Sequence, residues 1–190
     1  MDEVAVATAF LRHDCEVLAC HRSEDAPTFP GRWGGVSGVI EAGEEPVAAA
    51  RREASEEVGA AGLTAVRTAE PLRVEAPEYD AAFVVHPVLF DAPDRELTLS
   101  RELQAAEWLP ATELLGRETV PALFETYQRV APTVQSVAAD DEHGAATLSV
   151  RALEVLRVVQ RSGHHKRHPP QLHGQPPPDS AHLLTAPPVT

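Results

Sequence analysis

The segment from residue 44 to residue 60 constrains the fold most, because it predicts one helix with two chemically different sides. Pro46 stands where a first helical turn tolerates proline, and Gly59 stands where helices commonly end. At about 100° per residue, residues three and four apart share a face. One face carries apolar side chains and another carries carboxylates: Val47, Ala50, Ala54 and Val58 against Glu53, Glu56 and Glu57. We expect the apolar face to pack on a sheet.

The segments around this helix supply strands for such a sheet. Residues 4–11 and 15–20 are β-prone and flank a short polar break, which predicts a hairpin. Beyond a Gly/Pro-rich loop at 27–38 and the helix, we expect extended segments at 63–74, 81–90 and 103–109, and helices at 112–115 and 120–134. Strands mixed with a few helices over about 135 residues indicate one compact α/β or α+β domain.

The acidic face of the helix requires a compensating charge. Glu53, Glu56 and Glu57 repel one another on a shared face, and hard divalent cations such as Mg²⁺ or Mn²⁺ bind oxygen ligands. The simpler alternative is a solvated surface helix in which Arg51 and Arg52 are ordinary i,i+4 partners of the glutamates.

The spacing over the whole segment favours the metal site. Gly38, Glu44, Arg52-Glu53-Ala54, Glu56-Glu57 and Gly59-Ala60 follow one another at the intervals of the Nudix box. The chain therefore resembles the Nudix hydrolase family. Two aliphatic positions of the box are alanine here, Ala54 and Ala60, and Ser37 replaces one of the paired glycines that commonly precede the box.

The resemblance implies a fold and a reaction. The fold is α/β: an α/β/α sandwich with a mixed β-sheet. The reaction is Mg²⁺-dependent (or Mn²⁺-dependent) hydrolysis of a diphosphate P–O–P linkage in a nucleoside diphosphate-linked substrate. It also implies metal binding by Glu53, Glu56 and Glu57, with the backbone carbonyl of Ser37 as a further ligand.

The resemblance also assigns supporting roles. Arg52 orients a glutamate of the box, Glu44 belongs to the same network, and Glu53 is the first choice for general base. A further acidic ligand is expected from a loop outside the box. Glu102 is the first candidate, ahead of Glu107 and Glu96, with a solvated loop carboxylate as the alternative.

Substrate contacts are harder to derive from the sequence. Arg32 and Trp33, directly before the box, are the expected substrate-binding residues. Other aromatic residues could stack on a ring, and other arginines could contact phosphate: Phe29, Tyr79 and Phe83, and Arg22 and Arg73. Core packing is the competing role for Phe83, and a surface position is the competing role for each arginine.

The net charge of −13 limits the partners. An acidic surface repels nucleic-acid polymers and anionic membranes, so neither is expected as a partner. No apolar run of about 18 residues is present, and the N-terminus lacks the basic start of a secretory signal. We expect a cytoplasmic protein with a small nucleotide-type substrate, and a homodimer is one expected assembly. Cys15 and Cys20 are interpreted as plain thiols, with a zinc site including His13 and His21 as the alternative.

The chain divides into three parts by composition. A catalytic domain is expected at 1–138, a helical extension at 139–162 and a disordered tail at 163–190, where five of the nine histidines and seven of the 17 prolines lie. Residues 141–161 weakly resemble the start of an initiation-factor-2B-alpha-like domain, which would make them the remnant of a truncated second domain. The alternative is an ordinary C-terminal helix packed on the first domain.

Three functions are compatible with these observations. The first is a Mg²⁺-dependent hydrolase. The second is a non-catalytic sensor of nucleotides or sugar nucleotides, attached to an initiation-factor-2B-like sugar-phosphate enzyme. The third is chemistry like that of isopentenyl-diphosphate isomerase, which needs a catalytic cysteine beyond Trp33. Cys15 and Cys20 both precede Trp33, so this hypothesis ranks last.

Overall fold

A mixed β-sheet forms the centre of the protein, as expected. The computed structural model describes residues 2–141 and 144–165. The central strand β1 (Asp2–His13) runs parallel to β7 (Ala81–Asp91) along its whole length and antiparallel to β4 (Val36–Val39). The other strands are β2 (Glu16–Arg22), β3 (Trp33–Gly34), β5 (Thr64–Thr68), β6 (Leu72–Ala76) and β8 (Leu103–Leu109).

The sheet divides on one side of β1. Residues Val6 to Ala9 of β1 pair with β4, whereas only Arg12 and His13 pair with β2, in the expected hairpin. Strand β2 then pairs with β8 on its other edge, and β5 and β6 both pair with β7. Strands β4 and β2 therefore pair with different parts of β1.

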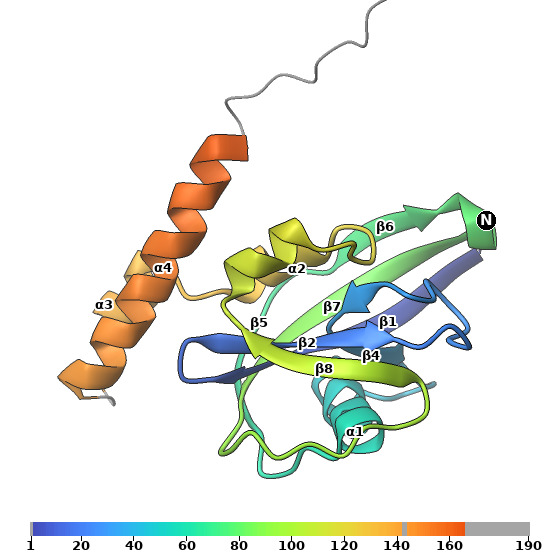
Figure 1. Cartoon of the computed structure of the whole chain (residues 1–190), viewed down its shortest axis with the longest axis horizontal. Coiled ribbons are helices and arrows are strands. Elements are labelled where there is room, and N and C mark those ends of the chain that lie inside the picture. The colour runs from blue at the N-terminus through green and yellow to red at the C-terminus, as the bar shows by residue number, and fades with distance from the viewer. Residues whose placement is uncertain (1, 142–143, 166–190) are drawn as a thin grey trace, which may run out of the picture.

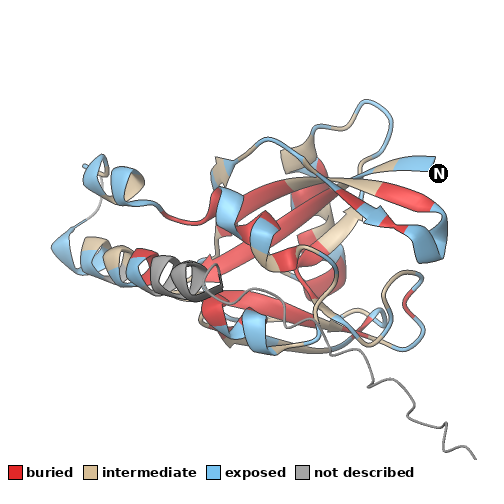
Figure 2. Cartoon of the chain, turned by 90° about the horizontal axis from the view of Figure 1, so that it is seen from above, coloured by how far each residue is buried: buried red, intermediate tan, exposed pale blue. Residues whose placement is uncertain are grey.

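Helices cover both faces of the sheet, so the layers are α/β/α (Figure 1). Helix α1 (Pro46–Val58) packs on β1, β4 and β7, and α2 (Leu123–Val130) packs on β7 and β5 from the opposite side. Alternate residues of β1 face the two layers: Ala7, Ala9 and Leu11 pack with α1, and Phe10 packs with Tyr127 of α2. In Figure 2 the central strands of the sheet are largely buried, whereas the outer loops are largely exposed.

Two predicted elements are cut short near prolines in the structure. The helix expected at 120–134 is the shorter α2, which ends at Val130 because Pro132 forces the preceding Ala131 out of helical geometry; a separate short helix, α3 (Val134–Ala138), follows. The extended segment expected at 63–74 is interrupted before β6, where Pro71 lies. The helix expected at 112–115 is a 3₁₀ helix, η2 (Ala111–Gly116), and another, η1 (Pro77–Tyr79), precedes β7.

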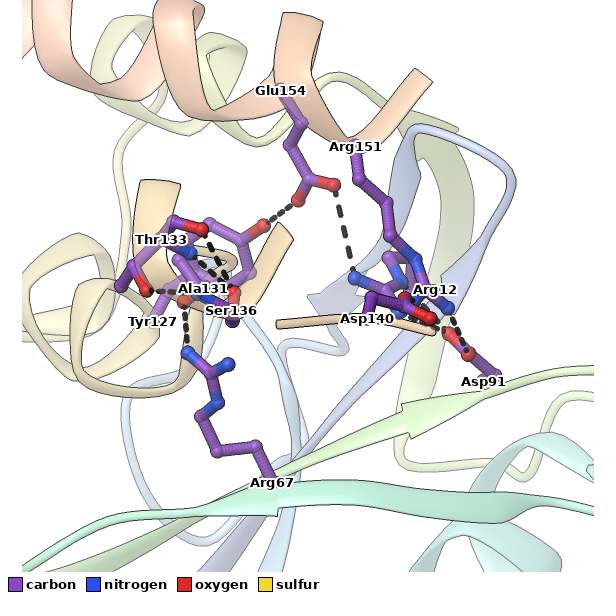
Figure 3. A network of polar contacts seen from close by, with 10 residues as sticks. All are labelled: Arg12, Arg67, Asp91, Tyr127, Ala131, Thr133, Ser136, Asp140, Arg151 and Glu154. Carbon is purple, nitrogen blue, oxygen red and sulfur yellow. Dashed lines mark hydrogen bonds and ion pairs between the residues drawn. The ribbon is translucent and has the colours of Figure 1, made fainter. Parts of the chain in front are cut away.

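A long C-terminal helix, α4 (Ala145–His165), is docked on the sheet domain through a polar network (Figure 3). Glu154 of α4 is buried, accepts a hydrogen bond from the Tyr127 hydroxyl and lies 3.9 Å from the Arg12 guanidinium. Arg12 pairs with Asp91 at 2.7 Å, and Arg151 of α4 reaches the same Asp91 at 3.4 Å. These contacts favour the interpretation of α4 as a C-terminal helix packed on the first domain.

Helix α4 continues three residues beyond the boundary expected at residue 162. The Pro/His-rich segment expected to be disordered lies outside the described residues from residue 166 onward. None of the helices within the described part of the chain combines the length and the apolar character needed to cross a bilayer.

Candidate active site

The end of α1 fixes where its glutamates lie. Gly59 adopts φ +69°, the left-handed conformation that favours glycine, and the backbone N–H groups of Gly59 and Ala60 close the helix. The segment before β8 then binds the last turn: Thr98 N–H donates to the Val58 carbonyl and Ser100 N–H donates to the Glu57 carbonyl, both at 2.8 Å. This docking brings the 98–102 segment to the acidic end of α1.

The glycine that begins the box makes room for a carboxylate. A Cβ added at Gly38 would lie 1.9 Å from the Glu53 carboxyl carbon, so Glu53 keeps this position only with glycine at residue 38. Gly38 pairs with Ala7 in the middle of the sheet. Glu53 can therefore extend from the α1 layer past β4, and reach the cavity described below.

Arg52 holds several carboxylates in place. Its guanidinium makes two hydrogen bonds of 3.0 Å to the two oxygens of Glu44, one of 2.6 Å to Glu53, and lies 3.4 Å from Glu56. The hydrogen bonds from Arg52 lower the pKa of Glu44 below its usual value. Arg52 thus contacts Glu44, Glu53 and Glu56 at once.

Glu57 is a buried carboxyl group with incomplete hydrogen bonding. It is 6% exposed, and its Oε2 atom has no hydrogen-bond partner among the described residues. Burial raises its pKa to about 8, with further increases from the charges of Glu53 and Glu102. The charge of Arg22 and a hydrogen bond from the Ser37 backbone act in the opposite direction. Glu57 thus lies in an environment where added positive charge would be favourable.

Glu53 and Glu57 line a cavity of about 490 Å³ on the α2 side of the sheet. Glu53, Glu57 and Glu102 form its acidic part together with Ser37 and Arg22. The remaining walls are mostly apolar and come from β1, β4, β6, β7, the loop before β3, and the start of α2. The same cavity therefore presents carboxylates to one portion of a ligand and apolar side chains to another.

The residues present fit a divalent cation. Within the described ranges, no three carboxylate, imidazole or thiol groups already converge at metal-binding distance. However, the unpaired Oε2 of Glu57 and the mutual repulsion of Glu53, Glu57 and Glu102 are the conditions that a hard cation with oxygen ligands relieves. Glu102 is the extra-box carboxylate that the structure brings to this cavity.

Other predicted ligands lie apart from the cavity lining. The Glu56 side chain is 61% exposed on the outer side of α1, in contact with Arg52. Glu107 pairs with Arg117 at 2.6 Å, and Glu96 lies elsewhere, beside Pro93 and Trp108.

The two expected substrate-binding residues do not line the cavity either. Arg32 is 48% exposed and lies 4.0 Å from Glu118. The Trp33 ring packs between His21, at 4.7 Å between ring centroids, and the Arg117 guanidinium, at 4.1 Å from the ring centroid. The backbone N–H of Trp33 donates to the Glu118 carbonyl, and the Trp33 carbonyl accepts from the backbone N–H of Val120. Trp33 therefore anchors the segment that carries Val120 into the cavity wall.

Sequence reasoning missed part of the cavity. Val120, Leu123 and Thr126 line it from the start of α2, and no local pattern distinguishes them from ordinary core residues. The alternation of Val4, Val6 and Thr8 along β1 was an available signal, because alternate residues of a strand share one face.

Neither cysteine lies in the cavity lining. Cys20 is buried in the α1-side core, where burial raises its thiol pKa well above the usual value, and Cys15 lies in the turn between β1 and β2. No zinc cluster including them is present among the described residues.

Comparison with known proteins places the chain in a family. Residues 1–130 match the model of the NUDIX domain, and the chain belongs to the Nudix hydrolase family. It is 25% identical over 123 residues to nucleoside triphosphatase NudI of Escherichia fergusonii, covering 60% of this chain and 86% of that protein. The match ends before α4, so the initiation-factor-2B-alpha-like resemblance of residues 141–161 receives no support from it.

Solved structures show the same fold. The crystal structure of the MutT protein from Methanosarcina mazei Go1 superposes with a TM-score of 0.56 at 25% identity, covering 67% of this chain and 92% of that one. The Nudix hydrolase RenU from M. smegmatis superposes with a TM-score of 0.58 at 21% identity, covering 76% and 91%.

Proposed function

We propose that this Nudix hydrolase cleaves a P–O–P linkage of a nucleoside triphosphate or a related nucleoside diphosphate derivative, with Mg²⁺ or Mn²⁺ as cofactor. The observation that carries the proposal is the cavity in which Glu53, Glu57 and Glu102 adjoin an apolar wall. The similarity to proteins named nucleoside triphosphatase supports the triphosphate class.

The proposed metal ligands are Glu53, Glu56, Glu57, Glu102 and the carbonyl of Ser37. A bound divalent cation neutralises polyphosphate charge and lowers the pKa of water. Glu56 lies on the outer side of α1, so in this proposal it binds the metal ion from the solvent side of the site.

The residues of the chain position the reaction. Arg52 holds Glu53 and Glu44 in fixed orientations through charge-assisted hydrogen bonds. Glu53 is the proposed general base: a water oxygen bonds to phosphorus, the bridging P–O bond breaks, and the water proton passes to the Glu53 carboxylate. Arg22, buried beside Glu57, is a proposed contact for a phosphate oxygen.

The decisive experiment combines a substrate panel with matched variants. Nucleoside triphosphates, dinucleoside polyphosphates, ADP-ribose, NAD(H) and nucleotide sugars are incubated with Mg²⁺ or Mn²⁺, using wild type, Glu53→Gln, Glu57→Gln and the surface control Glu113→Gln. We expect turnover by wild type and the control, and a loss of at least a hundredfold in the two site variants. Ligand binding without turnover under every condition would instead favour the sensor.

The proposal also covers the cellular location, the partners, the assembly and the domain division of the protein. We propose a cytoplasmic enzyme acting on small nucleotides and not on nucleic-acid polymers, consistent with its net charge of −13. A homodimer is the proposed assembly, which analytical ultracentrifugation tests directly. The domain division at residues 138 and 162 is likewise proposed, and limited proteolysis of the full chain tests it.

A further inference from the structure

The part of the cavity away from the carboxylates is apolar. Thr8 pairs with Ser37 near the acidic part, and Val4 lies four residues away along β1, or about 13 Å. Val4 is paired with Phe83 of β7, and Val6 with Val85. The apolar residues Val4, Val6, Phe83 and Val85 all line the cavity, and Ser37 lines its acidic part.

An aromatic side chain is held over this apolar part by a residue far away in sequence. Phe29 adopts φ +47°, a left-handed conformation that costs a non-glycine residue about 1–2 kcal/mol. Its backbone N–H donates to the Tyr79 hydroxyl at 2.6 Å. Its ring forms a T-shaped pair with the Tyr79 ring, at 5.0 Å between centroids, and its centroid lies 5.9 Å from that of Phe83. Phe29 and Phe83 both line the cavity.

Few polar side chains in this lining are available to read a base. Thr8 is bonded to Ser37 at 2.8 Å, Thr126 to the Ala122 carbonyl at 2.8 Å, and Thr28 to Arg22 at 3.4 Å. The described lining contains no Asn, Gln, Asp or His side chain. The backbone of Val6 is paired with a strand on each side, so its polar groups are also engaged.

We propose that Phe29, held by Tyr79, is the specificity-determining residue of this cavity, and that it selects a ring by apolar contact without discriminating between bases. The inference rests on the proposed hydrolysis of nucleoside polyphosphates. Discrimination by factors of 10⁴ or more requires hydrogen bonds that a wrong substrate leaves unpaired, whereas apolar contacts discriminate by about 10- to 200-fold. Rings with different polar groups on their edges are therefore discriminated only within that smaller range.

The test compares substrates with and without a ring. ATP, GTP, CTP, UTP and inorganic tripolyphosphate are hydrolysed by the full chain with Mg²⁺, and kcat and KM are measured for wild type, Phe29→Ala, Phe29→Leu and Tyr79→Phe. Leu115→Ala, on the exposed surface of η2, is the control. Thermal unfolding identifies any variant that does not fold, and Phe29→Leu keeps the side-chain volume if Phe29→Ala fails.

We expect kcat/KM for the four nucleotides to agree within about a hundredfold. Phe29→Leu and Tyr79→Phe raise the KM for all four nucleotides at least fivefold with kcat nearly unchanged, and leave tripolyphosphate unaffected. A preference above a hundredfold for one base, or an equal effect of Phe29→Leu on tripolyphosphate, overturns the inference while hydrolysis itself stands.

Binding measurements separate this inference from the proposed function. If no substrate is hydrolysed, calorimetry with the same four Mg²⁺–nucleotides is carried out on wild type and Phe29→Leu. Similar Kd values for the four bases, weakened together by the substitution, support the role of Phe29 although the hydrolase proposal fails. Unequal Kd values, or no binding of any nucleotide, overturn it.

Discussion

Glu57 combines a cost in the folded protein with a role at the proposed metal site. Its carboxyl group is buried, has an unpaired oxygen and has a pKa raised to about 8. A group whose pKa is raised in the folded state contributes stability below its unfolded pKa, and this contribution is lost as the pH rises through the folded pKa. A cation that binds the ionised carboxylate offsets that loss.

Glu57→Gln should therefore separate stability from metal binding. Without metal at pH 8, we expect the variant to be as stable as wild type or more stable, because it carries no buried charge. Mg²⁺ at about 100 times Kd should stabilise wild type by about 2.7 kcal/mol, and a hundredfold loss of affinity would reduce this to about 0.4 kcal/mol. Urea unfolding with and without Mg²⁺ measures both values. Equal stabilisation of the two proteins by Mg²⁺ would contradict the assignment.

Gly38 is the second residue with a specific steric role. In Gly38→Ala the new Cβ would meet the Glu53 carboxyl group at 1.9 Å, so Glu53 must move. A displacement of about 1 Å in a catalytic group can lower activity by about a hundredfold, and we expect a loss of that size in kcat/KM. Gly116→Ala is the matched control, since no atom lies within 4 Å of its added Cβ. Full activity of Gly38→Ala would show that Glu53 is not needed in this position.

At the scale of the element, helix α1 is capped more completely at its C-terminus than at its N-terminus. Its C-terminus is closed by Gly59 and by the 98–100 backbone, whereas the N-cap residue Glu45 makes no side-chain capping hydrogen bond. The extended backbone of Glu45, at φ −79° and ψ 142°, already suits a capping residue.

Glu45→Ser should stabilise the protein. A serine oxygen at this position can accept from an unpaired N–H of the first turn, and we expect a gain of about 0.5–1 kcal/mol in the free energy of unfolding. Glu45→Ala provides no such acceptor and should give no gain. Urea unfolding of the three proteins at one pH distinguishes the cap from the simple removal of a charge, which both variants share.

At the scale of the whole molecule, α4 is joined to the sheet domain by a buried carboxyl group. Burial is the main cause that raises the pKa of Glu154 above its ordinary value of 4.5. The hydrogen bond from Tyr127 and the charges of Arg12 and Arg151 lower it, and the charge of Asp91 raises it. The folded protein thus binds this proton more tightly than the unfolded chain does.

The docking of α4 should consequently depend on pH. The contribution of Glu154 is complete below about pH 4.5 and is lost as the pH rises through its raised folded pKa. We expect the stability of wild type relative to Glu154→Gln to fall as the pH rises above the ordinary pKa of 4.5 toward the raised folded pKa. Urea unfolding across this range measures the difference, with Glu113→Gln as an exposed control. A constant difference over the range would mean that the Glu154 pKa is not raised.

The sequence was sufficient where the chemistry is local. Pro46, Gly59 and the spacing of Glu53, Glu56 and Glu57 predicted the bounds of α1 and its two faces, because both depend on helical geometry over a few turns. Residues 103–109 were likewise predicted as the strand that is observed. The helix expected at 120–134 is shorter in the structure, because Pro132 disfavours helical geometry at Ala131 and α2 ends at Val130.

Tertiary structure decided what depends on distant segments. The sequence ranked Glu102 ahead of Glu107 as the extra-box ligand, but its place beside the box glutamates depends on the hydrogen bonds of Thr98 and Ser100 to the end of α1. Trp33 was expected to bind the substrate, but its ring packs against the Arg117 guanidinium. Phe29 lines the cavity instead, and its backbone is hydrogen-bonded to Tyr79, fifty residues away in the sequence. The sequence by itself determined the carboxylates and their helix through local periodicity. Their common cavity required strand pairing and packing between residues far apart in the chain, which no local pattern specifies.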